Sequence, residues 1–300
     1  MEKLLREFCL TERIPVLWRT PMSDYTSFRI GGPADAFLLP ETEKSFLGLL
    51  EFLKRHQIPF RVIGNGTNLL FSDAGFRGAV VSTRHMRGLT VCGNTVRAAA
   101  GTPLNVLCRT LADYSLGGLS SLYGIPGTVG GAVFMNAGAL GGTVADCLSY
   151  VSVFRIDTDT VDTLAKKDLD FSYRHSVFHA NKNSIILSAE FSFFYEEQEK
   201  IREKMKQNIE RRTETQPTAL PCAGSAFLRT ENGSAAVLIE KAGLKGARVG
   251  GAAVSLKHAG FIVNLGGATS EDVLALITLI QNTVKDRFGI LLIPEIEYVC

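Results

Sequence analysis

Three glycine-rich segments, at residues 28–35, 63–70 and 124–132, constrain the fold of this chain more than any other feature of its sequence. Glycine tolerates positive φ and has no side chain, so backbone N–H groups in such segments can approach an anion closely. One segment of this kind is typical of a turn, whereas three in one domain favour a phosphate-bearing cofactor. Leu69 stands where a dinucleotide fingerprint needs its third glycine, and no segment ends in Gly-Lys-Ser/Thr. Neither a Rossmann fold nor a P-loop is therefore indicated.

The composition is that of a globular chain with balanced charge. Its 300 residues are 46% hydrophobic and 21% charged, which is enough for two substantial cores. The net charge is +2 and no basic run forms a stripe, so we expect no nucleic-acid partner. No stretch approaches the ~20 apolar residues of a membrane span, and the first eight residues mix both charge signs, unlike a secretory signal. We therefore expect a cytoplasmic protein with no membrane partner.

Six cysteines are scattered along the chain. They are Cys9, Cys92, Cys108, Cys147, Cys222 and Cys300. No two of them form a Cys-x-x-Cys pair, the spacing that a zinc site or a redox dithiol needs. We expect buried or incidental thiols and no metal site.

The first two thirds of the chain mix strand and helix patterns. A helical segment is predicted at residues 1–24. A strand at residues 36–39, a helix with one apolar face and a strand at residues 60–63 predict a β-α-β unit that ends in the second glycine segment. The apolar face of that helix carries Phe46, Leu49, Leu50 and Leu53. More strands are expected at residues 79–82, 95–98, 151–154 and 185–187.

Two further helices have recognisable ends. Thr102 is the expected N-cap of one helix, with Pro103 at its first helical position. Ser270 is the expected cap of the other, and Gly289 ends it. A last strand is expected at residues 291–299.

A charged helix expected at residues 196–212 has few apolar anchors and favours a domain boundary. We therefore expect an α+β chain with one domain at residues 25–195 and a smaller α+β domain at residues 196–300.

Six motifs occur in the order and approximate spacing of one known family. They are TSFRIGGPAD at residues 26–35, GNGTNLL at 64–70, GIPGTVGGAVFMNAGA at 124–139, YRHS at 173–176, AGSAF at 223–227 and PEI at 294–296. On these motifs the chain resembles the UDP-N-acetylenolpyruvoylglucosamine reductase family over nearly its whole length. The chain has no tyrosine-bearing insertion between Arg174 and Ser225, and in this it is similar to the shorter of the family's two types.

The resemblance implies a fold, a reaction and a set of ligands. The fold is an FAD-binding domain of the vanillyl-alcohol-oxidase (PCMH) type in two subdomains, followed by a substrate domain whose last strand returns to the active site. The reaction reduces a UDP-linked enolpyruvyl amino sugar for peptidoglycan synthesis, and through the cell wall it affects cell shape, division and the cell cycle. FAD is bound without a covalent bond, and NADPH donates hydride and leaves before the sugar nucleotide binds. No oligomer is implied, and we expect a monomer.

The resemblance also implies which residues bind the ligands. The expected cofactor-binding residues are Ile30, Gly31, Gly32, Gly64, Asn65, Gly66, Thr67, Asn68, Leu69, Pro126, Gly127, Thr128, Gly130, Gly131, Asn136, Ala137 and Gly138. We expect backbone N–H groups of the glycines to supply most of the flavin contacts. The expected substrate-binding residues are Tyr173, Arg174, Lys257, His258 and Asn264.

Three residues match the family's catalytic positions. Hydride transfer to the terminal carbon of the enolpyruvyl group leaves negative charge on the adjacent carbon and its carboxylate, and the fork of Arg174 can bind that carboxylate at two points. Ser225 matches the proton donor, whose hydroxyl needs neighbours that polarise it. Glu295 matches the glutamate that assists protonation. Glu297 has the same strand parity, so periodicity alone does not choose between the two glutamates.

The chain departs from the family pattern in three places. The family usually has a proline where Thr230 follows Phe227-Leu228-Arg229, and an aromatic-Ala-Gly sequence near residues 232–236. Thr67 replaces the usual serine and keeps the hydroxyl. The first two departures affect the loop after Ser225, and none removes a catalytic residue.

Two other functions use the same features. An FAD oxidase would react with oxygen, and it would often attach its flavin through histidine or cysteine, neither of which occurs in the three glycine segments. A nucleotide-binding module without catalysis would need only the glycine segments. Bleaching of a yellow protein by NADPH would exclude the module, and slow reoxidation by oxygen would exclude the oxidase.

Overall fold

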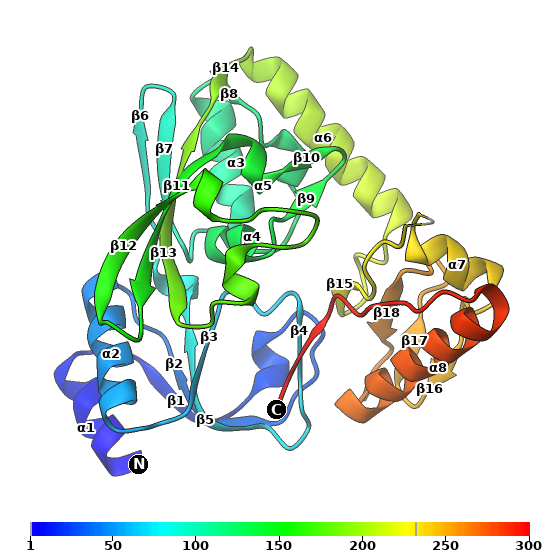
Figure 1. Cartoon of the computed structure of the whole chain (residues 1–300), viewed down its shortest axis with the longest axis horizontal. Coiled ribbons are helices and arrows are strands. Elements are labelled where there is room, and N and C mark those ends of the chain that lie inside the picture. Colours follow the sequence, from blue (N-terminus) through cyan, green and yellow to red (C-terminus); the bar gives the residue numbers. More distant parts are fainter. Residues whose placement is uncertain (1, 232) are drawn as a thin grey trace. The chain divides into compact units, whose positions relative to one another are not determined.

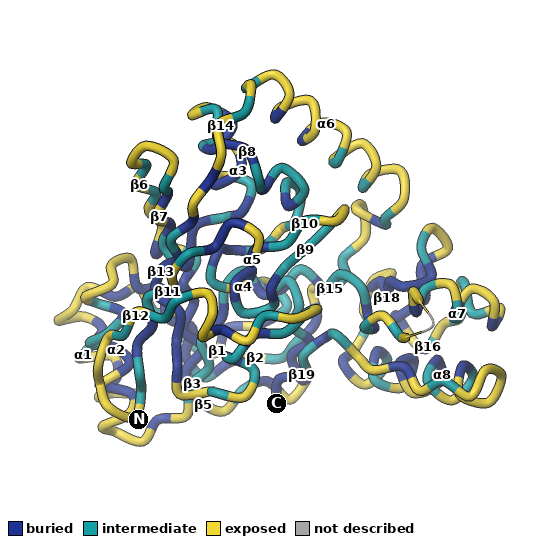
Figure 2. The backbone as a smooth tube through the Cα atoms, turned by 45° about the horizontal axis from the view of Figure 1, so that its top comes forward, coloured by how far each residue is buried: buried dark blue, intermediate teal, exposed yellow. Residues whose placement is uncertain are grey.

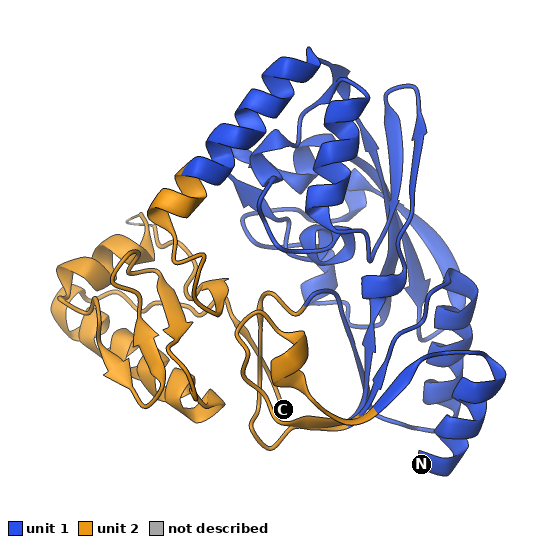
Figure 3. Cartoon of the chain, turned by 180° about the vertical axis from the view of Figure 1, so that it is seen from behind, with its two compact units in different colours: residues 1–17, 36–65, 78–210 blue, residues 18–35, 66–77, 211–300 orange. Residues whose placement is uncertain are grey.

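The computed structural model describes residues 2–231 and 233–300, so Met1 and Asn232 lie outside the described residues. The chain forms two compact units, which Figure 3 draws in different colours. Unit 1 consists of residues 1–17, 36–65 and 78–210, and unit 2 consists of residues 18–35, 66–77 and 211–300. Both units contain helices and strands, so the expected α+β class is confirmed.

The two units divide the chain differently from the ranges expected from its sequence. The expected charged helix is α6 (Gln198–Thr215), and the division falls inside it, after Glu210. Unit 2 takes residues 18–24 from the expected N-terminal segment, and residues 25–35 and 66–77 from the expected domain at residues 25–195. The N-terminal segment is only partly helical, because α1 (Glu2–Thr11) is followed by strand β1 (Val16–Pro21).

A four-stranded sheet contains the expected β-α-β unit (Figure 1). Its strands in spatial order are β1, β2 (Pro33–Leu38), β5 (Phe76–Ser82) and β3 (Phe60–Ile63). Helix α2 (Glu43–Arg55) connects β2 to β3 and buries its predicted apolar face. Strand β5 lies between β2 and β3 and pairs with β3 in parallel.

Unit 1 also contains a five-stranded antiparallel sheet. Its strands in spatial order are β12 (Thr160–Ala165), β11 (Leu148–Arg155), β13 (Ser184–Ser192), β7 (Thr95–Ala99) and β6 (Leu89–Cys92). Helices α3 (Leu104–Asp113) and α4 (Val129–Phe134) share one buried core with this sheet. Helix α6 adds only Ile201 and Met205 to that core, and Figure 2 shows most of its length exposed.

Unit 2 is built on a four-stranded antiparallel sheet and two helices. The strands in spatial order are β15 (Cys222–Ser225), β18 (Phe261–Asn264), β17 (Ala252–Val254) and β16 (Arg248–Val249), and the helices are α7 (Ala235–Lys241) and α8 (Ser270–Phe288). Phe28, Ile30 and Leu70 are buried in the core of this unit. These apolar residues explain why the first glycine segment and residues 66–70 of the second belong to unit 2, whereas residues 63–65 belong to unit 1.

The remaining elements are short. They are β4 (Leu69–Phe71) with β19 (Glu297–Val299), β8 (Leu116–Gly117) with β14 (Phe194–Tyr195), β9 (Gly138–Ala139) with β10 (Gly142–Thr143), helix α5 (Val144–Cys147) and the 3₁₀ turns Met22–Tyr25, Thr83–His85, Ser120–Leu122, Lys166–Asp168 and Val177–His179.

Three predicted element ends differ from the structure. Helix α3 begins one residue later than expected, with Pro103 as N-cap, because the Thr102 hydroxyl donates to the Gly88 carbonyl instead. The N-cap of α8 is Thr269, whose side chain accepts from the backbone N–H of Asp272. The last strand covers only residues 297–299. Gly289 ends α8 in the left-handed conformation, as expected.

Candidate functional site

The second and third glycine segments meet inside unit 1. The Asn65 side chain donates from Nδ2 to the carbonyl of Pro126 at 3.1 Å. A Cβ on Gly64 would lie 2.4 Å from Oγ1 of Thr128, a distance that real Cβ atoms do not show. Glycine at position 64 therefore allows the two segments to pack closely.

The first and second glycine segments meet inside unit 2. The backbone N–H of Ser27 donates to the carbonyl of Gly66 at 3.2 Å. Gly66 has a φ of 65°, and a Cβ there would lie 2.6 Å from the Tyr25 carbonyl oxygen. Gly31 has a φ of 133° and lies against Phe71. Both glycines are required by backbone conformation as well as by space.

Three of the glycine amides that we expected to hold the flavin already have acceptors in the protein. The N–H of Gly32 donates to Ser72, that of Gly130 to Ala100 at 2.8 Å, and that of Gly131 to the Thr128 hydroxyl. Thr128 thereby acts as the N-cap of α4. Gly31, Gly64 and Gly66 are the glycines of this set whose backbone N–H groups remain candidates for flavin contacts.

Several other expected cofactor residues are part of the fold itself. The Ile30 side chain is 2% exposed and belongs to the core of unit 2. The Gly127 carbonyl accepts from Leu104, and Leu69 pairs with Glu297 across β4 and β19. Ala137 continues the end of α4, because its N–H donates to the carbonyl of Ala132.

A tight turn at residues 172–175 carries Arg174. The backbone N–H groups of Ser172 and His175 each donate to the other residue's carbonyl at 3.2 Å. Arg174 has a φ of 55°, a left-handed conformation that costs a non-glycine residue roughly 1 kcal/mol. Its Nη2 donates to the carbonyl of Gly138 at 3.2 Å, and its guanidinium lies 5.3 Å from the centroid of the Tyr173 ring. The turn therefore lies beside Gly138, which follows the third glycine segment in the chain.

Asn136, which follows the end of helix α4, connects this turn to helix α5. Its Nδ2 donates to the carbonyl of Ser172 at 2.9 Å, and its Oδ1 accepts from the N–H of Ala145 at 3.2 Å. The side chain is 7% exposed. Both ends of the amide group thus bind protein atoms, although the sequence suggested a cofactor ligand.

Ser225 and Glu295 lie next to each other in unit 2. The backbone N–H of Glu295 donates to the carbonyl of Ala226, and that of Leu228 donates to Ile293, both at 2.9 Å. These bonds place Glu295 opposite the residue that follows Ser225. One carboxylate oxygen of Glu295, Oε2, is buried.

Backbone partners distinguish Glu295 from Glu297. Glu297 is the first residue of β19, where it pairs with Leu69, and its N–H donates to the carbonyl of Asn68. The Asn68 side chain donates to the carbonyl of Glu295 at 3.0 Å. Glu295 therefore belongs with the Ser225 strand, and Glu297 belongs with the second glycine segment.

Comparison with known proteins gives the same picture for both parts of the chain. Residues 34–163 match the family model of an FAD binding domain, and residues 216–299 match the C-terminal domain of UDP-N-acetylenolpyruvoylglucosamine reductase. The reductase of Caldanaerobacter subterraneus subsp. tengcongensis is 43% identical over 93% of this chain and 92% of the relative. Reductase 1 of Bacillus cereus is 41% identical over 100% of this chain and 99% of the relative.

The chain belongs to the UDP-N-acetylenolpyruvoylglucosamine reductase family. A solved structure of this family, from Thermus caldophilus, superimposes with a TM-score of 0.79 at 35% identity, covering 96% of this chain and 99% of that one. The resemblance deduced from the sequence motifs and the expected fold class are both confirmed. The chain is a flavin-dependent oxidoreductase, so the non-catalytic binding module is set aside.

The three substrate-binding residues expected in unit 2 have different surroundings. The exposed side chain of Lys257 donates from Nζ to the carbonyl of Thr213. Nδ1 of His258 accepts from the backbone N–H of Gly260 at 3.1 Å, which requires an unprotonated Nδ1. Burial lowers the pKa of His258, in agreement with that hydrogen bond.

Asn264 has the environment of a structural residue. Its Nδ2 donates to the carbonyls of Phe28 and Arg29, and its Oδ1 accepts from the N–H groups of Gly266 and Ala268. The side chain is 7% exposed. These four bonds use most of its hydrogen-bonding capacity. The expected role in substrate binding is therefore less consistent with the structure than a role in holding the first glycine segment.

We predict that Asn264→Ala lowers the free energy of unfolding by about 2 kcal/mol, because it leaves buried backbone groups without partners. Urea unfolding of the enzyme without substrate measures this loss. Asn183→Ala, at an exposed position, is the control and should unfold like the parent. Parent stability combined with weak substrate binding would instead make Asn264 a ligand.

Arg212 is a candidate that the sequence did not single out, because it lies in the charged helix α6. In the structure it is partly buried, burial lowers its pKa, and it lies close enough to Cys222 to interact with that thiol. The sequence feature that could have identified Arg212 is its position at the C-terminal end of α6, shortly before the strand that carries Ser225.

The loop after Ser225 explains one departure from the family pattern. Thr230 and Gly233 each donate a backbone N–H to the other's carbonyl, at 2.9 and 3.0 Å. The family's usual proline at position 230 has no N–H and could not make the first of these bonds. The second departing segment includes Asn232, which lies outside the described residues.

The cysteines fit the expectation of buried or incidental thiols. Cys9, Cys108 and Cys147 are buried. Burial raises the pKa of Cys9 and Cys147 to about 11 and that of Cys108 to about 12, so these thiols stay protonated and unreactive at neutral pH.

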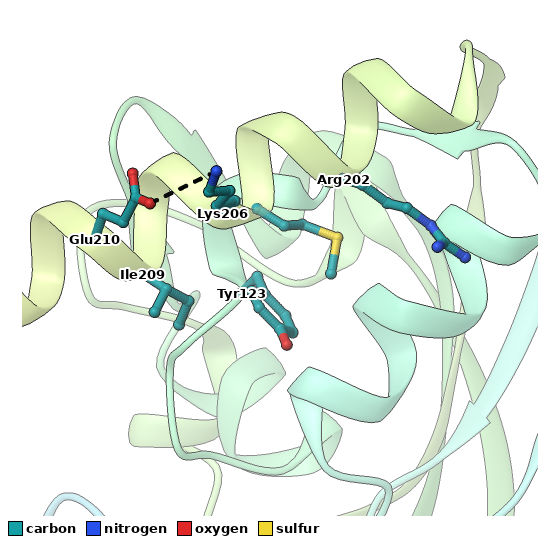
Figure 4. Close-up of a pocket in the computed structure, with 6 residues that line it drawn as sticks. Tyr123, Arg202, Lys206, Ile209 and Glu210 are labelled. Carbon is teal, nitrogen blue, oxygen red and sulfur yellow. Dashed lines mark ion pairs between the residues drawn. The ribbon is translucent and has the colours of Figure 1, made fainter.

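A hollow of about 400 Å³ lies beside α6, and none of its lining residues, which Figure 4 draws, is among those expected to be functional. It is lined by Tyr123, Arg202, Met205, Lys206, Ile209 and Glu210. Arg202 pairs with Asp113 at 2.8 Å and Lys206 with Glu210 at 4.0 Å, so both cations are partly neutralised.

Within residues 2–231 and 233–300, no helix has the length and hydropathy needed to cross a bilayer. Within the same residues, no three His, Cys, Asp or Glu side chains are grouped so that they could hold a metal ion.

Proposed function

We propose that this chain catalyses the NADPH-dependent, FAD-mediated reduction of UDP-N-acetylenolpyruvoylglucosamine to UDP-N-acetylmuramate, a step of peptidoglycan precursor synthesis in the cytoplasm. The observation that carries the proposal is the 41% identity to a reductase of this name over 100% of the chain. The residues 25–195 then serve FAD binding and residues 196–300 serve substrate binding. We propose that the enzyme acts as a monomer.

The glycine segments are compatible with FAD. Gly31, Gly64 and Gly66 offer backbone amides at positions where a side chain would clash. Histidine and cysteine are absent from all three segments, so they offer no side chain for a covalent flavin bond. When bound, FAD supplies the redox chemistry by accepting hydride from NADPH and delivering it to the terminal carbon of the enolpyruvyl group.

Arg174 binds the carboxylate of the enolpyruvyl group in this proposal. The bond to Gly138 and the adjacent Tyr173 ring restrict the guanidinium before substrate arrives. A guanidinium fork can meet both carboxylate oxygens, and it stabilises the negative charge that develops as hydride reaches the neighbouring carbon.

Ser225 donates the proton that completes the reduction. Its hydroxyl proton moves to the carbon next to the carboxylate, and the serine oxygen is left with the negative charge until solvent reprotonates it. Glu295 is placed beside the Ser225 strand by the Ala226 hydrogen bond. It assists this protonation.

We predict that the purified protein is yellow and that denaturation releases all of its flavin. The reason is that the glycine segments offer only non-covalent contacts. Absorbance of the supernatant after acid precipitation and filtration measures the released fraction. Flavin that stays with the polypeptide would contradict the prediction and favour the oxidase alternative.

The proposed function is tested by two half-reactions. Anaerobic NADPH should bleach the flavin, and UDP-N-acetylenolpyruvoylglucosamine should restore its absorbance much faster than oxygen does. Restoration by oxygen alone would contradict the proposed reaction.

A further inference from the structure

Three hydrogen bonds join residues 134–138 to the turn that carries Arg174 and to Ser176, the residue that follows it. Asn136 donates to the Ser172 carbonyl at 2.9 Å, and the Ser176 hydroxyl donates to the Phe134 carbonyl at 2.5 Å. Arg174 itself donates to Gly138. Ser176 is fully buried, whereas Ser172 is exposed. Ser176 is held by burial as well as by its hydrogen bond, whereas exposed Ser172 depends more on its hydrogen bond from Asn136.

The orientation of the Asn136 amide group is fixed by its surroundings. The backbone N–H of Ala145 is a donor, so the atom that faces it must be the acceptor Oδ1. Nδ2 then faces the Ser172 carbonyl. The residue has a φ of 42°, a left-handed conformation that asparagine, aspartate and glycine tolerate best. The backbone conformation and both side-chain hydrogen bonds of Asn136 are thus those of a residue that holds neighbouring segments together.

We propose that Asn136 is a positioning residue for Arg174 and that it does not bind the flavin. The proposal rests on the proposed role of Arg174 as the site of the substrate carboxylate. Arg174 occupies a left-handed conformation that the turn must maintain, and the Ser172 carbonyl is the atom that closes the turn. Asn136 binds that carbonyl from the segment that follows helix α4, so it fixes the turn that orients the guanidinium.

The first test separates positioning from flavin binding. Asn136→Gly keeps the left-handed backbone and removes both side-chain bonds. Asn136→Asp keeps the acceptor for the Ala145 N–H and removes only the donor to the Ser172 carbonyl. This variant replaces the glycine variant in the test if the glycine variant does not fold. Stopped-flow absorbance follows each half-reaction. We expect reoxidation by UDP-N-acetylenolpyruvoylglucosamine to slow about tenfold, while flavin content and bleaching by NADPH stay within about twofold.

A matched control is Asn94→Asp. The Asn94 side chain makes the same kind of bond, from Nδ2 to the carbonyl of Phe193 at 2.8 Å, in the same unit. It should leave both half-reactions at the parent rates. Loss of flavin, or slower bleaching by NADPH, in the Asn136 variants would overturn the proposal and make Asn136 a cofactor ligand.

A double-mutant cycle tests whether Asn136 acts through Arg174. In an Arg174→Ala background, Asn136→Gly should slow substrate reoxidation less than about twofold, because the guanidinium that it positions is gone. A tenfold effect in both backgrounds would overturn the proposal. If Arg174→Ala alone leaves reoxidation at the parent rate, the proposed role of Arg174 fails, and the positioning proposal fails with it. A parent enzyme that is never reoxidised by this sugar nucleotide would overturn the proposed function itself, which is a different result.

Discussion

Ser225→Ala is expected to leave the flavin spectrum and bleaching by NADPH unchanged and to reduce transfer to the sugar nucleotide about 10³-fold or more. Proton donation in a transition state contributes roughly 10²–10⁴ in rate, and here it belongs only to the second half-reaction. Stopped-flow absorbance measures the two half-reactions separately, since flavin colour is lost in one and regained in the other.

Two variants control this prediction. Ser225→Cys, with a better acid of similar size, should restore part of the rate. Ser149→Ala removes a hydroxyl that hydrogen-bonds to the hydroxyl of Ser192, and it should behave as the parent. If the alanine variant at position 225 is reoxidised at the parent rate, Ser225 is only a turn residue. Glu295 would then be tested as the sole proton source.

Arg174→Lys is expected to keep flavin reduction by NADPH and to lose about a hundredfold in turnover of the enolpyruvyl substrate. Lysine cannot reproduce the two-point contact with a carboxylate, and an interaction lost in the transition state costs roughly 3 kcal/mol. Steady-state kcat/KM for the sugar nucleotide, compared with the rate of bleaching, measures the difference.

The control for that prediction is Arg202→Lys, at an exposed arginine that pairs with Asp113. It keeps the charge at a site where geometry matters little, so both half-reactions should be unchanged. Equal slowing of bleaching and of substrate turnover by Arg174→Lys would show that Arg174 serves another step.

The sequence predicted those parts of the fold that depend on neighbouring residues. Helix α2 buries the face that carries Phe46 and Leu53, strand β3 has its predicted bounds, and Gly289 ends α8. These features follow from local periodicity and capping. The N-cap of α3 was misplaced because the Thr102 hydroxyl bonds to Gly88, a partner outside the helix.

The sequence identified which residues belong to the motifs of the candidate site, but it did not show which of them bind ligands and which hold the fold. Backbone hydrogen bonds between residues 226–228 and 293–295 place Glu295 beside the end of the strand that carries Ser225. Asn136 and Asn264 occur in motifs that suggest ligands, yet their side chains bind backbone groups of distant segments. Asparagine can serve either purpose, and only the three-dimensional partners distinguish them.

The pairing of β4 with β19 has a consequence for how the chain folds. This pairing places Leu69 beside Glu297, and the core of unit 2 needs Phe28 and Leu70 together with residues beyond position 211. Contacts between such distant segments require a large loop to close before they stabilise anything, which slows folding. During synthesis unit 2 cannot complete its core until its C-terminal strand has left the ribosome. The first two glycine segments, which are made early, therefore reach their native contacts only after the last residues of the chain have been made.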